Sequence, residues 1–220
     1  MVKKVDENDA RQVIAVLEKI LASNDSIKAL CEKNKKIAQH LAKEDKLEKR
    51  TAQLIIMHYS NLCAAGGGAS AIPGLIPGIG LIYSLLGTTA LNSFLMLKFE
   101  LEMSLALSHL AGFDIEDPRE RKIAFLLACT ALEDAYDEEK EPSIGTVLDL
   151  AINEYSTREL SKTLVKAVAR VMMMFLAKRW TRLFPFVGIG IEASVNKVLS
   201  AQLGRECWRA IRRRRNAQDN

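Results

Sequence analysis

The feature that most restricts how this chain can fold is a run of 47 consecutive residues, 51–97, without a single Asp, Glu, Lys or Arg. Within this run only His58 and Cys63 carry groups that titrate near neutral pH. Most of the other side chains are apolar. An uncharged segment of this length has to be kept away from water by other helices, by an apolar ligand or by lipid.

The charged residues outside this run are segregated along the chain. The formal net charge is only +4, from 31 basic and 27 acidic residues. However, residues 98–160 carry 6 basic and 15 acidic side chains, whereas residues 161–220 carry 13 basic and 3 acidic ones. An acidic middle and a basic end are more informative about function than the total, which by itself does not indicate nucleic-acid binding.

Apolar residues spaced by three and four positions predict amphipathic helices in the first third of the chain. The first stripe consists of Val13, Leu17, Ile20 and Leu21, and the second of Ile27, Leu30, Ile37 and Leu41. We expect the break between these helices at residues 24–26. A third stripe, formed by Ala52, Ile55, Ile56, Tyr59 and Leu62, is expected to end at the glycines 66–68.

The remaining helices are predicted from turn and cap residues. An apolar Pro/Gly turn, Ile72–Gly80, precedes a helix expected from Pro77 to about Leu110, with Gly112 ending it. Helix starts with capping residues are predicted at 117–120 and at 156–159, and a final helix is expected to end near Arg213.

These patterns predict an all-α fold, because no alternating segment is long enough for a strand. We expect a single-domain bundle of about six to eight helices, with a hydrophobic central helix entered through the Pro/Gly turn. Residues 1–47 would form N-terminal amphipathic helices, residues 48–213 the helical core, and residues 214–220 a basic, polar tail.

The segment Ile79–Leu97 is close to the length that a bilayer requires, which is about 20 residues. Its ten Ile, Leu, Phe and Met residues contribute on the order of −3 to −6 kcal/mol to insertion, and its polar residues and glycines oppose this. Three interpretations stay open: a buried central helix, a helix that can enter a bilayer, and a permanent transmembrane hairpin.

Arginines recur along one face of the final predicted helix. Arg205, Arg209, Arg212 and Arg213 follow helical spacing, Arg214 and Arg215 extend the cluster, and Trp208 lies close by. A basic stripe with an amphipathic aromatic residue is typical of helices at anionic membrane surfaces. A solvated basic helix end is the alternative. Nucleic acid is not expected as a partner, because no stacking aromatic residues are interleaved.

Short Pro/Gly motifs occur twice, each before a predicted helix: Pro77 to Gly80, and Pro185 to Gly188. Small and amide residues follow the second motif at every fourth position, including Asn196 and Gly204. Such rows allow helices to approach closely. Three interpretations of this repetition stay open: two tight helix contacts, a pair of half-helices around a site, or coincidence.

No catalytic, metal or cofactor motif occurs in the sequence. The three histidines are isolated, and no nucleophile elbow, zinc motif or phosphate loop is found. We therefore expect no enzymatic activity, no metal and no cofactor. The four widely spaced cysteines are expected to be free thiols in a reducing compartment, and the start of the chain lacks a secretion signal.

The chain resembles the EcsC family of bacterial helical proteins over roughly residues 45–213. The motifs that carry the resemblance are Ile72–Gly80, Ala111-Gly112-Phe113-Asp114 with Asp117-Pro118 and Arg121, and Pro185-Phe186-Val187-Gly188 through Val195-Asn196 to Gly204. The resemblance implies an all-helical, membrane-associated protein without an established enzymatic reaction. It also implies that Asp114, Arg121, Asn196 and Gly204 are structural or ligand-facing positions.

The leading hypothesis is a cytoplasmic protein that binds anionic lipid at the inner face of the cell membrane and inserts an apolar hairpin, 72–97. The alternatives are a soluble carrier of an apolar ligand, a pore-forming protein, and a subunit of a membrane protein complex; the oligomeric state is open. The expected lipid-binding residues are Ile72, Leu75, Ile76, Ile79, Ile82, Leu86, Arg205, Trp208, Arg209, Arg212 and Arg213. The expected structural-motif residues are Pro73, Pro77, Gly80, Asp114, Arg121, Pro185, Gly188, Asn196 and Gly204.

Overall fold

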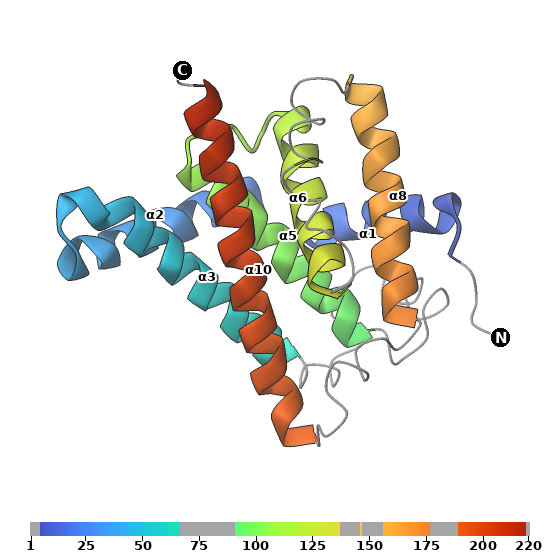
Figure 1. Ribbon diagram of the computed structural model, residues 1–220, viewed down its shortest axis with the longest axis horizontal. Helices are drawn as coiled ribbons and strands as arrows, with labels where there is room; N and C mark the ends of the chain where they lie inside the picture. Colours follow the sequence, from blue (N-terminus) through green and yellow to red (C-terminus); the bar gives the residue numbers. More distant parts are fainter. Residues whose placement is uncertain (1–4, 67–90, 137–145, 147–155, 177–188, 219–220) are drawn as a thin grey trace.

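Helical periodicity and cap residues produce an all-α bundle in the computed structural model, which describes residues 5–66, 91–136, 146, 156–176 and 189–218 (Figure 1). These residues contain seven α-helices, one short 3-10 helix and no strand. One hydrophobic core includes buried side chains from all seven α-helices. The predicted all-α, single-domain fold is therefore confirmed.

The turn between the first two helices lies a few residues before its predicted position. Helix α1 spans Glu7–Ile20 and helix α2 spans Asn24–Leu41. The expected break at 24–26 is wrong, because the Ser23 side chain caps α2 by accepting the N–H of Ser26. The turn is also fixed from the core, where the Glu102 carboxylate accepts the Ala22 N–H at 2.6 Å.

The buried face of α2 is also rotated from the predicted stripe. Ile37 and Leu41 are 40% and 56% exposed. The residues of α2 that are buried are Ile27, Cys31, Asn34 and Ala38. Small side chains at the contact allow α2 to pack closely on α3 and α5, and the two larger apolar residues then fall outside it.

Helix α3, Leu47–Gly66, follows a one-turn 3-10 helix, Glu44–Lys46, and ends at the first of the three glycines, as predicted. Four residues of its predicted stripe are buried: Ala52, Ile55, Ile56 and Tyr59. Helix α3 packs against α2, α5 and α10. It therefore joins the N-terminal helices to the rest of the core.

Helix α5, Leu91–Leu110, is the central helix, because it packs against α2, α3, α6 and α10 (Figure 1). The ranges 94–97 and 100–108 are buried without interruption, so every face of the helix is covered. Gly112 terminates it with φ of +93°, a left-handed conformation that favours glycine. The predicted end is confirmed, whereas the predicted start at Pro77 lies outside the described residues.

Two helices begin at the predicted caps. Helix α6 spans Pro118–Tyr136, and the Asp117 carboxylate before it accepts the N–H of Arg119 at 2.9 Å. Helix α8 spans Thr157–Leu176, and its first turn contains a reciprocal capping box between Ser156 and Glu159. Helix α8 packs against α1 and α6.

The last helix, α10, spans Ile189–Gln218 and is longer than predicted. It packs against α3, α5 and α6 and continues five residues beyond Arg213. The extension is held by ion pairs of Arg214 with Glu120 on α6 and of Arg215 with Glu48 on α3. Residues 214–218 are therefore part of the bundle.

Helices α3, α5 and α10 meet closely at Gly204. A methyl group at this position would lie 2.8 Å from Met103 Sδ and 2.9 Å from Ile56 Cγ1. Such distances are shorter than van der Waals contact, so only glycine fits without a shift of these neighbours. The predicted close helix contact is confirmed here, and Asn196 and Ser200 of the same row are also buried.

Candidate functional site

A cluster of positive charge lies where α10 runs beside α3. Five exposed cationic residues line one hollow between these helices: Lys49, Arg205, Arg209, Arg212 and Arg213. We refer to these five side chains as the cationic face. The sequence placed the four arginines on one side of a helix, and the structure confirms that they line the same site.

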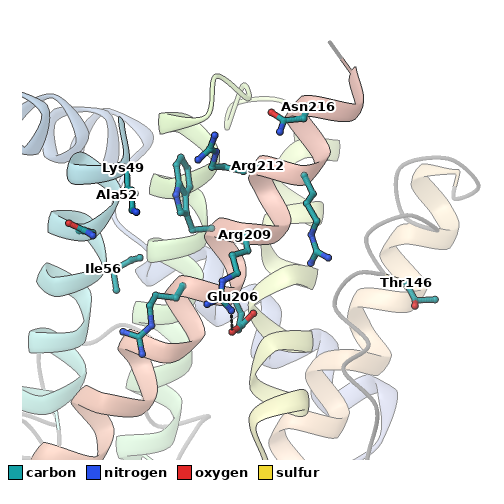
Figure 2. Close-up of a pocket in the computed structure, with 12 residues that line it drawn as sticks. Lys49, Ala52, Ile56, Thr146, Glu206, Arg209, Arg212 and Asn216 are labelled. Carbon is teal, nitrogen blue, oxygen red and sulfur yellow. Dashed lines mark hydrogen bonds and ion pairs between the residues drawn. The ribbon is translucent and has the colours of Figure 1, made fainter. Parts of the chain in front are cut away.

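The hollow has a volume of about 890 Å³ and combines a charged rim with an apolar floor. Figure 2 shows Lys49, Ala52 and Ile56 on α3 across from Arg209 and Arg212 on α10. The other lining residues are Gln53, Thr146, Arg205, Glu206, Trp208, Arg213 and Asn216. Such a volume is within the range of sites for small organic ligands.

Most of the charge of the cationic face is not neutralised by the protein. Arg209 donates to Glu206, which is the one acid among the described residues that line the hollow, at 2.5 Å, and the two side chains are 64% and 41% exposed (Figure 2). Within the described part of the chain, no ion pair involves Lys49, Arg205, Arg212 or Arg213. Four cations are therefore available to an anionic partner.

A second hollow continues from the first toward the N-terminal end of α10. It has a volume of about 430 Å³ and shares Gln53, Ile56 and Arg205 with the first. Its other lining residues are Arg50, Leu54, Met57, Ser60, Lys197 and Ala201. Together, the two hollows form one groove, which we call the α3/α10 groove. Cations line both hollows, five of them the first and three the second, and the exposed wall of the second hollow is mostly apolar.

Trp208 does not have the role that the sequence suggested. Its side chain is only 8% exposed and belongs to the hydrophobic core. The prediction of an indole ring at a lipid surface is therefore wrong for this conformation. The ring instead forms part of the floor of the hollow, because its position on α10 faces the contact with α3.

Arg214 and Arg215 do not extend the cationic face, contrary to prediction. Arg214 is 6% exposed, donates to both carboxylate oxygens of Glu120 at 2.5 and 2.6 Å, and stacks 4.0 Å above the Phe113 ring. Arg215 pairs with Glu48. Successive helical residues are rotated by about 100°, so this run of arginines cannot share one face.

Acidic residues buried in the core were missed by the sequence analysis. Glu100, Glu102 and Glu133 are each 5% exposed or less. Glu102 accepts Lys98 Nζ at 2.6 Å, and Glu133 accepts Arg170 Nε at 2.8 Å. The spacing of Lys98 and Glu102, four residues apart within an apolar helix, was the available signal.

Glu100 differs from the other two because Cys63 lies against it, with Sγ 3.6 Å from Oε1. Burial raises the pKa of Glu100 to about 8, against the opposing influence of the Ser200 and Cys63 side chains. The carboxyl group is therefore mostly protonated at neutral pH, which reduces the cost of burying it.

All four cysteines are free and buried, as predicted for free thiols. Burial raises the pKa of Cys31 to about 12 and raises the pKa values of Cys63, Cys129 and Cys207 as well. Thiols of this kind are poor nucleophiles, because the reactive thiolate is scarce at neutral pH. In the described residues, no group of three or more His, Cys, Asp and Glu side chains could hold a metal ion.

The other motif residues within the described ranges have structural contacts. Asp114 accepts the N–H of Glu116 at 2.9 Å in the turn before α6. Arg121 donates to the Asn24 side chain at 2.9 Å and lies over the Phe125 ring, and burial lowers its pKa. Asn196 is on the buried side of α10. None of these residues lines the α3/α10 groove.

Most of the expected apolar lipid-binding residues fall in the segment 67–90, outside the part of the chain that the structure describes. Ile72, Leu75, Ile76, Ile79, Ile82 and Leu86 lie outside the described residues, as do Pro73, Pro77, Gly80, Pro185 and Gly188. The described end of the uncharged run, Phe94–Leu97, is buried in the core. Among the helices that the structure describes, none is both long and apolar enough to span a bilayer.

Comparison with models of known protein families, with curated proteins and with solved structures gives no match. Membership of the EcsC family therefore stays a prediction based on the motifs in the sequence.

Proposed function

We propose that the protein is a non-enzymatic, peripheral membrane protein that binds anionic lipid surfaces through its cationic face. The observation that carries this proposal is the set of five exposed cations around one hollow, with Glu206 as the one acid among the described residues that line it. Each Lys or Arg near an anionic membrane contributes about 1 kcal/mol of attraction. Five such residues on one face are enough for reversible binding from solution.

A lipid surface fits this face better than nucleic acid does. The floor of the hollow is built from Ala52, Ile56 and Trp208, so the cations surround an apolar base that is itself nearly covered. Among the described residues that line the two hollows, the one aromatic residue is Trp208, which is buried and cannot stack on an exposed base. Mixed cationic and apolar surface is the composition that binds at the headgroup boundary of a membrane.

Insertion of residues 72–97 is not part of this proposal. Phe94–Leu97 are already covered by other helices, and the rest of that segment lies outside the described residues. A pore-forming function and a role in a membrane protein complex stay predictions from the sequence, as does the location at the inner face of the cell membrane.

Co-sedimentation with vesicles tests the proposal. We expect binding to vesicles that contain phosphatidylglycerol, little binding to pure phosphatidylcholine, and a decrease with rising salt, since exposed charges are screened over about 10 Å at 0.1 M. The combined substitutions Arg205→Gln, Arg212→Gln and Arg213→Gln should weaken binding on the order of 100-fold, at about 1 kcal/mol per residue.

A matched variant controls for net charge. Lys35→Gln, Lys36→Gln and Lys43→Gln remove three exposed cations from another part of the protein, and binding should fall much less. The proposal would be contradicted if as much protein were recovered with neutral vesicles as with anionic ones. It would also be contradicted if both triple variants lost the same amount of vesicle binding. Preference for a short duplex DNA over anionic vesicles at equal salt would identify nucleic acid as the partner instead.

A further inference from the structure

The α3/α10 groove has a gradient of polarity along its length that a flat membrane-binding surface does not need. Arg209, Arg212, Arg213 and Lys49 line only the hollow nearer the C-terminal end of α10. The adjoining hollow is lined by fewer cations, Arg50, Lys197 and Arg205, and most of its exposed wall is apolar. Because both hollows share Gln53, Ile56 and Arg205, a single elongated molecule can occupy them together.

Apolar exposure coincides with the less charged end of the groove. Four large apolar side chains are exposed in the described residues, and two of them, Met57 and Val198, belong to the two helices that form the groove. Met57 lines the second hollow, at 52% exposure. Val198, at 64% exposure, lies three residues before Ala201, on the same side of α10. Single exposed apolar residues are ordinary, but their position beside a hollow that leads to a cationic cluster indicates an amphiphile.

We propose that the α3/α10 groove binds one molecule of an anionic phospholipid, with its phosphate among Lys49, Arg209 and Arg212 and an acyl chain along Ile56, Met57 and Ala201. This inference rests on the proposed membrane association and identifies the ligand class of the same face. Guanidinium groups bind phosphate oxygens through paired, charge-assisted hydrogen bonds. The apolar end shields the chain from water, and the volume of the groove suits part of a lipid.

Glu206 opposes the binding of a phosphate group at this site. Its carboxylate accepts a hydrogen bond from Arg209 at 2.5 Å and is the one negative charge among the described residues that line the hollow. A bound phosphate competes with Glu206 for Arg209 and is repelled by the carboxylate. Removal of that charge therefore makes the site better for a phosphate, which is the opposite of what a mutation of a needed contact would do.

Calorimetric titration with soluble lipids tests the proposal on the full-length chain. The probes are dibutanoyl, dihexanoyl and dioctanoyl phosphatidic acid below their aggregation concentrations, glycerol 3-phosphate, and dihexanoyl phosphatidylcholine. We expect one molecule bound per chain, with affinity rising about fourfold for each methylene that is fully buried, until the apolar end is filled. Glycerol 3-phosphate and the phosphatidylcholine should each bind at least tenfold more weakly than dihexanoyl phosphatidic acid.

Two substitutions separate the two ends of the site. Glu206→Gln should strengthen the binding of both phosphatidic acid and glycerol 3-phosphate several-fold, whereas Glu32→Gln, which removes an exposed acid from α2, should not. Ala201→Trp should fill the apolar end and reduce the affinity for dioctanoyl phosphatidic acid at least tenfold, with glycerol 3-phosphate unaffected. The control is Gln202→Trp, at the adjacent exposed position.

The outcomes distinguish this inference from the proposed function. Equal affinity for phosphatidic acid and glycerol 3-phosphate would overturn the lipid site and identify a site for a free phosphate. Binding to anionic vesicles without binding of any soluble probe would also overturn it, but would leave membrane association intact. Failure to bind anionic vesicles as well would refute the proposed function itself. Since Glu206→Gln changes a half-buried residue at the surface and predicts a gain in affinity, loss of folding cannot imitate its expected result.

Discussion

Arg213 and Arg214 are neighbours in the chain and lie in opposite environments. Arg213 is exposed on the cationic face and forms no ion pair among the described residues, whereas Arg214 is buried, paired with Glu120 and stacked on Phe113. An arginine side chain is thus exposed on one side of α10, whereas on the other side an arginine holds the bundle together. Charge in a sequence does not distinguish these roles, but the rotation of the helix and the position of an acid on a neighbouring helix do.

The largest effect expected is from Arg214→Ala, which should destabilise the fold by about 3 to 5 kcal/mol, because it leaves Glu120 without its cation. Urea denaturation measures the loss. Arg213→Ala should change stability by no more than about 0.5 kcal/mol. Similar losses for the two variants would show that both arginines have the same role and would remove the contrast between the two sides of α10.

Glu100→Gln tests whether the buried Glu100 carboxyl group is protonated. Cys63, Ser200 and Cys207 lie near this group, on the side of α10 that faces the core. The unfolded chain loses this proton near its ordinary pKa of 4.5, whereas the folded protein retains it up to about pH 8. Stability due to Glu100 is therefore present at low pH and falls as pH rises from about 5 to 8, by about 1 to 1.5 kcal/mol per pH unit.

The Gln variant cannot ionise, so its stability should not show this decrease. Denaturation of both proteins at several pH values from 5 to 9 gives the difference directly. If the two curves run parallel across this range, the Glu100 carboxyl group does not retain its proton in the folded state.

Gly204→Ala probes the contact of α10 with α3 and α5. Overpacking costs about 1 to 3 kcal/mol, and the better helix propensity of Ala recovers about 1 kcal/mol, so we expect a net loss of about 1 kcal/mol. Gln202→Ala, on the exposed side of the same helix, should be neutral or slightly stabilising. A gain in stability for Gly204→Ala would mean that Met103 and Ile56 yield easily at this contact.

Arg215→Ala should have the smallest effect, a loss of about 0.5 to 1 kcal/mol. The Arg215 and Glu48 side chains are 28% and 35% exposed, and solvent weakens the attraction within such pairs. The loss should shrink further at high salt, which thermal unfolding at two ionic strengths can measure. A loss as large as that of Arg214→Ala would show that partial exposure does not weaken this pair.

Local signals in the sequence were sufficient for most of the helix ends. The caps at Asp117 and Ser156 and the left-handed Gly112 depend on neighbouring residues alone, so they could be predicted without a partner helix. The uncharged run and Gly112 predicted a central helix from Pro77 to about Leu110, and the described part of it, Leu91–Leu110, is central in the bundle. By contrast, the rotation of α2 that exposes Ile37 depends on how closely α3 and α5 approach it.

The candidate site could be predicted only in part. Helical spacing correctly grouped Arg205, Arg209, Arg212 and Arg213, because Arg209 lies four residues after Arg205 and three and four residues before Arg212 and Arg213. Lys49, the fifth member of the cationic face, comes from α3, more than 150 residues away in the sequence, and no local pattern connects it to α10. The burial of Trp208 likewise depends on the neighbouring helices.

The missing side chain at Gly204 also has a consequence for the exterior of the molecule. At that point the backbone of α10 fits against Met103 and Ile56 with no space for even one more carbon atom. Turning the helix about its own axis would bring a bulkier neighbour into the same gap and force the three helices apart. The rotation of α10 about its own axis is thus fixed by a contact deep inside the protein. This rotation determines the direction in which the exposed guanidinium groups of α10 project into the solvent.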